Sequence, residues 1–333
     1  MLVLIAGPVH PQEAPAPVRC EVAVQEVVLS DGVRRYGIPV TIGDTEVLAG
    51  IDTGAAGLRL MPDVVAIGQV KAGAVAETYS FGSGAHLTGV VGQARVRIGA
   101  LGGTAAVHLV QNVDCIARAP GCPGRLGLGY GFLGDGLPKE GFRVLLGANM
   151  GLSTVDNPLR AVGARQWILE VPRPGEAAPG RLILNPTAAE MAGYVSLRLA
   201  GGHAERDGGG LHDSVPGCLR HEETGRKVCG LMTLDTGAFS IRVLNAPANA
   251  PRFAAGAPVA LEFWDEDRKT AATAHVVLGR PAQGIYYGSA PRPETIIQLG
   301  AAPYYAYSVL YDPVRRRLGF KARPPVEGLP RAD

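Results

Sequence analysis

The sequence predicts a mostly β protein made of two halves of common design. Its 333 residues include 46 glycines and 26 prolines, two residue types that are poor inside helices, without a Gly-X-Y period. Apolar segments of strand length alternate with turn residues. The motif Asp-Thr-Gly, preceded by an apolar segment, occurs once in each half of the chain. We therefore expect many short strands, arranged as a repeated unit around the two motifs.

The first part of the chain has the pattern of a strand meander. We predict strands over residues 22–29, 36–42, 46–51, 95–98 and 104–110. The Gly-rich segment 121–141 is predicted to be irregular rather than the interior of an element. Helical signals are few, and one plausible helix covers residues 188–191, with Pro186 near its expected start.

A segment rich in proline and glycine, residues 172–180, divides the chain roughly in half and is predicted to be a loop or linker. Four regions follow from this division. They are a signal-like or disordered N-terminal segment at 1–19, an N-terminal lobe at 20–172, a C-terminal lobe at 173–326 and a tail at 327–333.

The composition excludes several classes of protein. Apolar residues make up 47% of the chain and charged residues 19%, and 32 Lys and Arg nearly balance 30 Asp and Glu. This balance argues against a disordered, highly charged chain and against a nucleic-acid partner. No segment has the roughly 18 consecutive apolar residues of a membrane-spanning helix, so we expect no membrane span.

The five cysteines comprise one isolated residue, Cys20, and two local pairs. Cys115 and Cys122 are 7 positions apart, and Cys218 and Cys229 are 11 positions apart. Neither pair has the spacing or the further ligands of a zinc site, so disulfides are favoured over free thiols, with a metal the least expected. The pairing state of Cys20 is left open.

The expected compartment follows from the cysteines and the start of the chain. Disulfides favour an oxidising environment. The short apolar run 1–7, followed by the Pro-rich segment 8–17, resembles an incomplete signal peptide. We therefore expect a secreted or periplasmic protein.

The two copies of the repeated motif are Asp52-Thr53-Gly54 and Asp235-Thr236-Gly237. Average composition gives such a triplet ~0.05 times by chance in a chain of this length. Each copy is followed by a second repeated element, an apolar segment that ends in glycine, at 144–147 and 297–300. This order predicts that the halves meet about a two-fold axis.

Two adjacent carboxyl groups are suited to the hydrolysis of a peptide bond by water. One accepts a proton from the water and the other donates a proton to the carbonyl oxygen. Like charges so close do not both ionise, so the pair titrates as a unit. Gly54 and Gly237 let backbone amides approach the carboxylates, and Thr53 and Thr236 are expected to hydrogen-bond across the junction of the halves.

With these motifs the chain resembles the two-lobed, pepsin-like aspartic proteases, as a member of bacterial type. The resemblance covers most of residues 34–322 and rests on the doubled triplet together with flanking motifs. These are Tyr36-Gly37-Ile38, Leu58 and Pro62 around the first triplet, Phe81-Gly82-Ser83-Gly84 at the position of the family's flap, and Leu299-Gly300, Val309-Leu310-Tyr311-Asp312 and Leu318-Gly319-Phe320 near the end.

The resemblance implies a pepsin-like fold with an interlobe cleft and a β-hairpin flap. It also implies a monomeric aspartic endopeptidase that binds extended polypeptide and pepstatin-type inhibitors and needs no cofactor and no metal. By the family's pattern Asp52 is the ionised base and Asp235 the initial acid. The residues expected to support them are Thr53, Gly54, Thr236 and Gly237 around the dyad and Gly82 and Ser83 at the tip of the flap.

The sequence departs from the family at four positions. Ala55 and Ala238 stand where the family has Ser or Thr, so two hydroxyl donors to the carboxylates are absent, which predicts raised pKa values and activity toward mildly acidic or neutral pH. Phe81 aligns with the flap tyrosine, and Tyr79 is the alternative flap aromatic. Arg59 replaces an aromatic residue of the substrate wall, which weakens the expected preference for bulky apolar side chains there.

A second interpretation of the same sequence is a catalytically weak, pepsin-like module that binds or inhibits a peptide or protein. The altered residues at 55, 59, 81 and 238 favour it. The presence of both aspartates favours the enzyme, because relatives without catalysis usually lack one of the pair.

Overall fold

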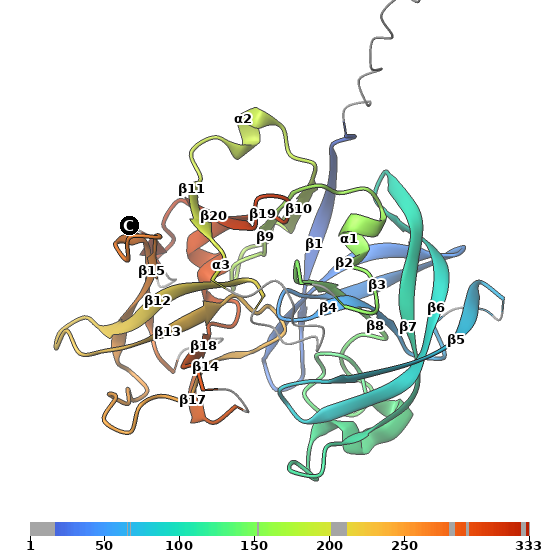
Figure 1. Ribbon diagram of the computed structural model, residues 1–333, viewed down its shortest axis with the longest axis horizontal. Coiled ribbons are helices and arrows are strands. Elements are labelled where there is room, and N and C mark those ends of the chain that lie inside the picture. The colour runs from blue at the N-terminus through green and yellow to red at the C-terminus, as the bar shows by residue number, and fades with distance from the viewer. Residues whose placement is uncertain are drawn as a thin grey trace, which may run out of the picture.

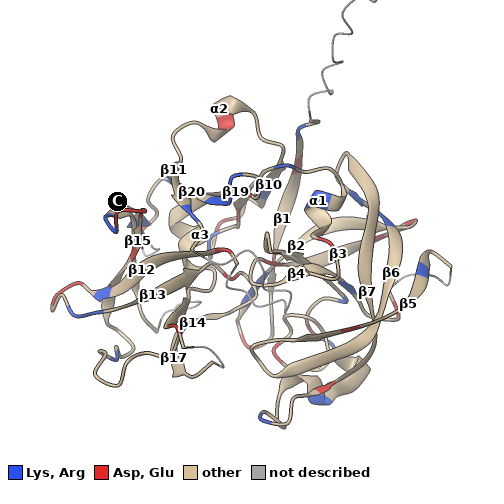
Figure 2. Ribbon diagram, in the orientation of Figure 1, with Lys and Arg blue, Asp and Glu red and all other residues tan. Residues whose placement is uncertain are grey.

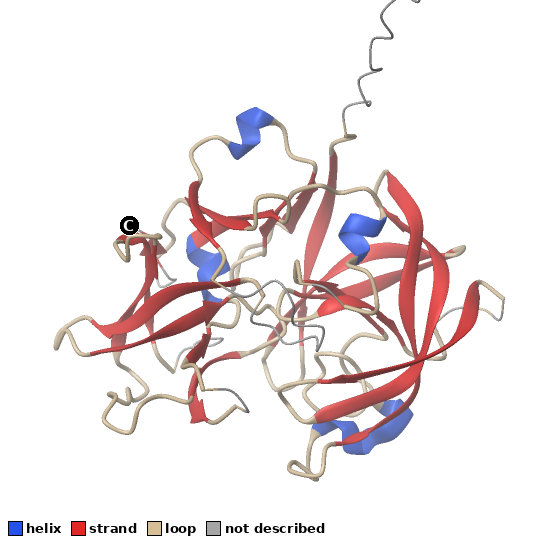
Figure 3. Ribbon diagram, viewed as in Figure 1, coloured by secondary structure: helices blue, strands red, loops and turns tan. Residues whose placement is uncertain are grey.

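The computed structural model describes residues 17–64, 66, 68–151, 153–200, 212–279, 284–290, 293–327 and 331–332. Strands predominate over helices, which confirms the predicted mostly β class (Figure 3). Of the predicted N-terminal segment 1–19, residues 1–16 lie outside the described residues.

The larger sheet has 13 strands and draws on both halves of the chain. Its strands from the first half are β1 (Cys20–Val28), β2 (Arg34–Ile42), β3 (Thr45–Asp52), β4 (Ala56–Leu60), β5 (Val70–Ser80), β6 (Ala85–Ile98), β7 (Leu101–Cys115) and β8 (Val144–Ala148). The others are β9 (Trp167–Glu170), β10 (Gly180–Leu184), β11 (Val195–Arg198), β19 (Tyr307–Asp312) and β20 (Arg317–Ala322). The order is β11-β20-β19-β9-β10-β1-β2-β3-β8-β4-β7-β6-β5, so β1 lies between a strand from mid-chain and a strand of the first half (Figure 1).

The smaller sheet has eight strands, all from the second half of the chain. They are β12 (Ser214–His221), β13 (Lys227–Thr233), β14 (Ser240–Leu244), β15 (Pro258–Trp264), β16 (Thr270–Val277), β17 (Gly284–Gly288), β18 (Ile296–Gln298) and β21 (Arg331–Ala332). Their order is β17-β14-β18-β13-β12-β15-β16-β21. In Figure 2 acidic and basic residues are interspersed over both sheets.

The described helices are short. They are η1, a 3-10 helix (Pro123–Gly129), α1 (Pro158–Ala161), α2 (Ala188–Met191) and α3 (Ala302–Ala306). The predicted helix at 188–191 is confirmed, and it begins with a capping box in which Thr187 and Glu190 bond each other's backbone. The Gly-rich segment 121–141, predicted to lack regular structure, contains η1, whose φ/ψ angles break at Gly127.

Burial follows the position of each strand. The start of β1 alternates buried and exposed side chains, because successive residues of a strand point to opposite faces. In contrast, every residue of β4 and β8 is buried, so both faces of these central strands are covered. Each buried Leu or Val there contributes about 1.5–3 kcal/mol relative to an exposed one.

The segment 172–180 is the connection between two paired strands. It joins β9 to β10, which are antiparallel neighbours with Leu169 opposite Leu182. Of the two predicted possibilities for this segment, a loop or a linker, the structure shows a loop. A linker between separate sheets would not join adjacent strands of one sheet.

Both predicted cysteine pairs form disulfides, which confirms that expectation. The Cα atoms of Cys115 and Cys122 are 5.7 Å apart, and those of Cys218 and Cys229 are 4.0 Å apart. The second pair joins directly opposite residues of β12 and β13. Cys20 is a buried free thiol.

Candidate active site

Each Asp-Thr-Gly triplet lies at the end of a strand, and the two strands belong to equivalent three-strand arrangements. In the first half β3 pairs in parallel with β8, and β8 pairs antiparallel with β4. In the second half β13 pairs in parallel with β18, and β18 pairs antiparallel with β14. The repeated elements predicted at 144–147 and 297–300 therefore lie at equivalent places, beside the strand that leads to each triplet.

The two aspartates meet between these strand sets. Their carboxyl groups lie close enough that each influences the pKa of the other. The backbone amide of Gly54 donates to Asp52 Oδ1 at 2.8 Å, and that of Gly237 donates to Asp235 Oδ1 at 3.0 Å. A Cβ on Gly54 would lie 2.5 Å from Asp235 Oδ1, and one on Gly237 would lie 2.6 Å from Asp52 Oδ1. Only glycine allows each backbone to approach the opposite carboxyl so closely.

The threonines of the triplets bond across the junction, as the sequence predicts. The amide of Thr236 donates to Thr53 Oγ1 at 3.0 Å, and the amide of Thr53 donates to Thr236 Oγ1 at 3.1 Å. Each hydroxyl in turn donates to a backbone carbonyl of the other half, Thr53 to Leu234 and Thr236 to Ile51. These reciprocal bonds, between side chains that are 1% exposed, fix the two triplets relative to each other.

The environment raises the pKa of both aspartates. For Asp52 the causes are burial first and then the charge of Asp235, and for Asp235 the cause is burial. Desolvation and a neighbouring like charge both disfavour ionisation, so the two carboxyl groups titrate as a coupled pair. Which of the two carries the proton in the free protein stays a prediction.

A cleft of about 620 Å³ opens over the dyad. Asp52 and Asp235 lie at its floor, and residues 79–83 of the hairpin formed by β5 and β6 line it. Residues of the first half, including Tyr130 and Asp135, form one wall, and residues of the second half, including Phe239, form the other. The cleft therefore has the volume to hold a peptide-sized ligand in contact with the two carboxyl groups.

Both candidate flap aromatics line this cleft. The rings of Tyr79 and Phe81 meet edge to face with centroids 4.9 Å apart, and Phe81 also packs against Phe132 at 6.2 Å. Gly82 and Ser83 form the tip of the hairpin and line the cleft as well. The Gly82 carbonyl accepts a hydrogen bond from Arg242 of β14 at 3.4 Å, so the tip contacts the opposite wall.

Arg59 does not form part of the cleft wall, which corrects the expectation drawn from its position. Its side chain is fully buried, with the guanidinium carbon 3.5 Å from the centroid of the Tyr79 ring. Because the tyrosine ring stands where the cleft is and the arginine lies beneath it, an aromatic surface is retained on that side.

Sequence reasoning missed Arg35 and Asp135. Arg35 is 1% exposed and donates to the carbonyl of Gly237 at 2.9 Å and to Asp135 Oδ1 at 2.6 Å. Arg35 directly follows Arg34 at the start of β2, and this pair of charged residues ahead of a mostly apolar strand was the available signal. Asp135 had none, because it lies in the Gly-rich segment.

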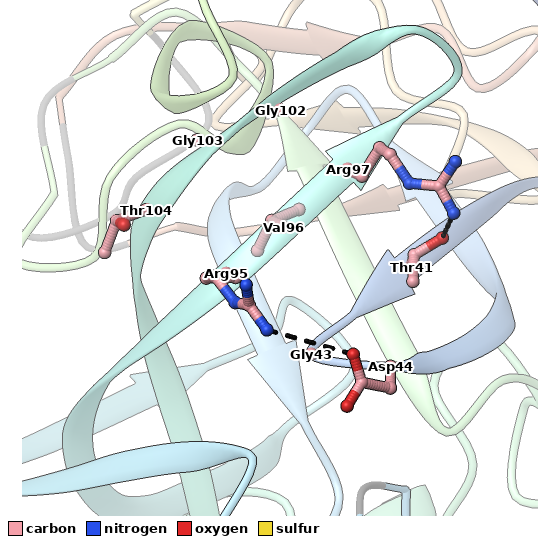
Figure 4. A pocket seen from close by; sticks show the side chains of 9 residues that line it. All are labelled: Thr41, Gly43, Asp44, Arg95, Val96, Arg97, Gly102, Gly103 and Thr104. Carbon is pink, nitrogen blue, oxygen red and sulfur yellow. Dashed lines mark hydrogen bonds and ion pairs between the residues drawn. The ribbon is translucent and has the colours of Figure 1, made fainter.

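A second hollow lies away from the dyad, on β2, β6 and β7 (Figure 4). Its volume is about 590 Å³. Arg97 donates to Thr41 Oγ1 at 3.1 Å, and Arg95 faces Asp44 at 3.8 Å with both side chains about four-fifths exposed. None of the predicted site residues lies here, so we place the candidate site at the aspartates.

No cluster of three or more His, Cys, Asp or Glu side chains suited to a metal ion occurs in the described part of the chain. Within the same residues, no helix has both the length and the apolar character needed to cross a bilayer.

Comparison with known proteins adds no family. No protein-family model matches the chain, and no curated protein matches it significantly. Functional inference therefore depends on the site itself.

Proposed function

We propose that the protein is an aspartic endopeptidase that hydrolyses a peptide bond of an extended polypeptide. The observation that carries the proposal is that Asp52 and Asp235, from separate halves of the chain, line one cleft, with each carboxyl group lying against the glycine of the opposite triplet. Such a pair supplies a proton acceptor and a proton donor at one place. No cofactor enters this mechanism.

We extend the proposal to a two-lobed, pepsin-like arrangement in which the hairpin of β5 and β6 is the flap. The equivalent strand sets β3-β8-β4 and β13-β18-β14 support it, since each half presents one triplet in the same way. The reciprocal threonine bonds support it too, because they join the halves at the dyad.

The proposed reaction uses one water and one shared proton. The ionised carboxylate accepts a proton from water as the water oxygen attacks the carbonyl carbon, and the protonated carboxyl donates its proton to the carbonyl oxygen. The tetrahedral intermediate then breaks its C–N bond while the amine takes a proton from the protonated carboxyl and one hydroxyl of the intermediate gives its proton to the ionised carboxylate, which restores the singly protonated dyad. The amides of Gly54 and Gly237 hold the carboxylates in place through both steps.

The substrate in this proposal lies along the cleft as a strand, between the hairpin tip and the wall of the second half. Backbone hydrogen bonds would provide affinity and side-chain pockets would provide preference. Apolar side chains fit beside Tyr79, Phe81 and Phe239, which line the cleft. We expect the enzyme to act as a monomer, because both aspartates come from one chain.

The two disulfides support a secreted or periplasmic location for the enzyme. Disulfides persist in oxidising compartments and are rare in reducing ones.

The decisive test is cleavage of denatured casein across about pH 3–7, with and without pepstatin, by the parent protein and by Asp52→Ala. We expect cleavage by the parent that pepstatin inhibits, and a loss of about 10²–10⁴-fold in the variant. Asp44→Ala is the matched control, because Asp44 is 80% exposed and lies in the other hollow.

The competing proposal is a peptide-binding or inhibitory module. Well-folded parent protein that binds pepstatin but cleaves nothing at any pH would favour it over the enzyme.

A further inference from the structure

Arg59 is a buried cation close to the first aspartate. It lies on β4, is 0% exposed, and donates from Nη1 to the carbonyl of Ala56. Its Nε and Nη2 atoms have no hydrogen-bond partner within the described residues. An arginine in this state is costly unless negative charge lies nearby. The nearby anionic groups are Asp52 and Glu77, the latter held by a hydrogen bond from Thr154.

Arg35 occupies a comparable place beside the second aspartate. It reaches from β2 of the first half to the second triplet, where Nη1 donates to the carbonyl of Gly237. The amide of that same glycine donates to Asp235. The Nε of Arg35 donates to the carbonyl of Leu133, and its Nη2 donates to Asp135. The guanidinium is therefore held by three hydrogen-bond partners.

Each arginine acts on one aspartate. The charge of Arg59 opposes the upward shift of the pKa of Asp52, which burial and Asp235 cause. The charge of Arg35 likewise opposes the shift of the pKa of Asp235, which burial causes. Both aspartates nevertheless keep pKa values above the ordinary range.

The other charged and titratable groups of the region do not replace these cations. Burial, with a contribution from Arg59, lowers the pKa of His108 to about 3, so this neighbour of Arg59 on β7 is neutral. Burial raises the pKa of Tyr79, Tyr130 and Tyr304 well above the working range, so these phenols are neutral as well. The remaining charged groups around the dyad and the arginines are Glu77 on β5 and Asp135 and Arg242 on the cleft walls.

We propose that Arg35 and Arg59 are a pair of fixed cations near the dyad, which favour its singly ionised state. Both are positioning residues, since Arg35 acts through the backbone of the second triplet and Arg59 lies behind Tyr79. The consequence for catalysis rests on the proposed endopeptidase function.

The test is the titration of the two carboxyl groups by ¹³C NMR, with the dyad signals assigned by their absence in Asp52→Asn and Asp235→Asn. In Arg59→Met, which keeps an unbranched apolar side chain without the charge, we expect the first titration step of the pair to rise by about one pH unit or more. Arg59→Lys should stay close to the parent. Arg95→Met is the matched control, because Arg95 is 81% exposed, and it should shift nothing.

Arg35→Met tests the second cation, and near-UV circular dichroism establishes that each variant is folded. If Arg59→Met does not fold, Arg59→Gln, which keeps an amide donor for Ala56, replaces it. Folded variants of both arginines that titrate like the parent would overturn the proposal. A parent protein whose pair loses its first proton only above about pH 7 would overturn it without any variant, because two cations should favour the first ionisation.

The pH profile of casein cleavage separates this proposal from the proposed function. If the titration shifts in the arginine variants but the parent protein cleaves no casein, the result would support the cation pair and reject the endopeptidase. If the parent protein cleaves casein but the arginine variants titrate like the parent, the result would support the endopeptidase and reject the cation pair.

Discussion

The two triplets are alike in their inner bonds and different in their surroundings. Each aspartate accepts from the amide two residues later, and each threonine bonds the opposite half. Asp52, however, is 4% exposed beneath packed aromatic rings, whereas the wall beyond Asp235 carries Phe239 and Tyr286, which are 50% and 53% exposed. The symmetric bonds position the carboxyl groups, and the asymmetric walls leave one side of the cleft preformed and the other open.

Substitution of the two triplet threonines should show the largest difference in stability between the two halves of the site. Thr53 Oγ1 has three partners, namely the Leu234 carbonyl, the Thr236 amide and the Tyr304 hydroxyl, whereas Thr236 Oγ1 has two. At about 1 kcal/mol for each bond, Thr53→Val should lower the free energy of unfolding by about 3 kcal/mol and Thr236→Val by about 2 kcal/mol. Urea denaturation measures both, and equal losses would show that the tyrosine bond contributes nothing.

The two disulfides, one in each half of the chain, allow the halves to be compared away from the dyad. By the loop-closure model, replacing either pair by alanines should lower the free energy of unfolding by about 2–3 kcal/mol. Cys122 precedes Pro123, which lines the cleft, whereas the Cys218–Cys229 bond joins two strands outside it. We therefore expect weaker pepstatin binding only without Cys115–Cys122. Calorimetry of the two variants checks this, and weaker binding by both would contradict it.

The burial of Asp52 predicts a pH dependence of stability. Because its pKa is raised in the folded protein, the native state holds more protons than the unfolded chain above about pH 4. The stabilisation is present at acid pH and is lost as pH rises through the raised value. Asp52→Asn removes this loss, so its stability relative to the parent should rise by more than about 1 kcal/mol between acid and neutral pH. If the stability of Asp52→Asn and that of the parent change in parallel with pH, the pKa of Asp52 is not raised. Asp44→Asn is the control, and its stability should change in parallel with that of the parent.

The aromatics of the hairpin give the smallest expected effect. Tyr79 covers Arg59, and such a stacked cation is worth about 1 kcal/mol, so Tyr79→Leu should lower kcat/KM for a peptide by about fivefold. Phe81→Leu removes only ring packing and should cost less. Steady-state kinetics measures both, and a larger loss at Phe81 would make it the principal flap aromatic.

Local patterns predicted much of the fold. The strand segments, the helix at 188–191 and the cysteine pairs were readable because alternation, capping residues and spacing are local properties. The element after each triplet was readable as well, because β8 and β18 repeat the same apolar pattern beside β3 and β13.

The surroundings of the dyad were not readable in the same way. Arg59 faces inward because Tyr79, twenty residues away in the chain, covers it, and no local pattern contains that contact. Arg35 is buried because its partners at 133, 135 and 237 come from distant segments. Residue type suggested exposed side chains for both arginines, and long-range partners decided otherwise.

The order of the large sheet governs how the chain assembles during synthesis. β1 is made early, but its neighbour β10 follows more than a hundred residues later, and β19, which flanks β9 on the side opposite β10, is among the last strands to be made. Until each of these partners is made, one backbone edge of β1 or of β9 is unpaired, and such edges bind other extended chains. A chain whose synthesis ends before β19 would therefore be prone to aggregate, and the synthesis of β19 protects the edge of β9.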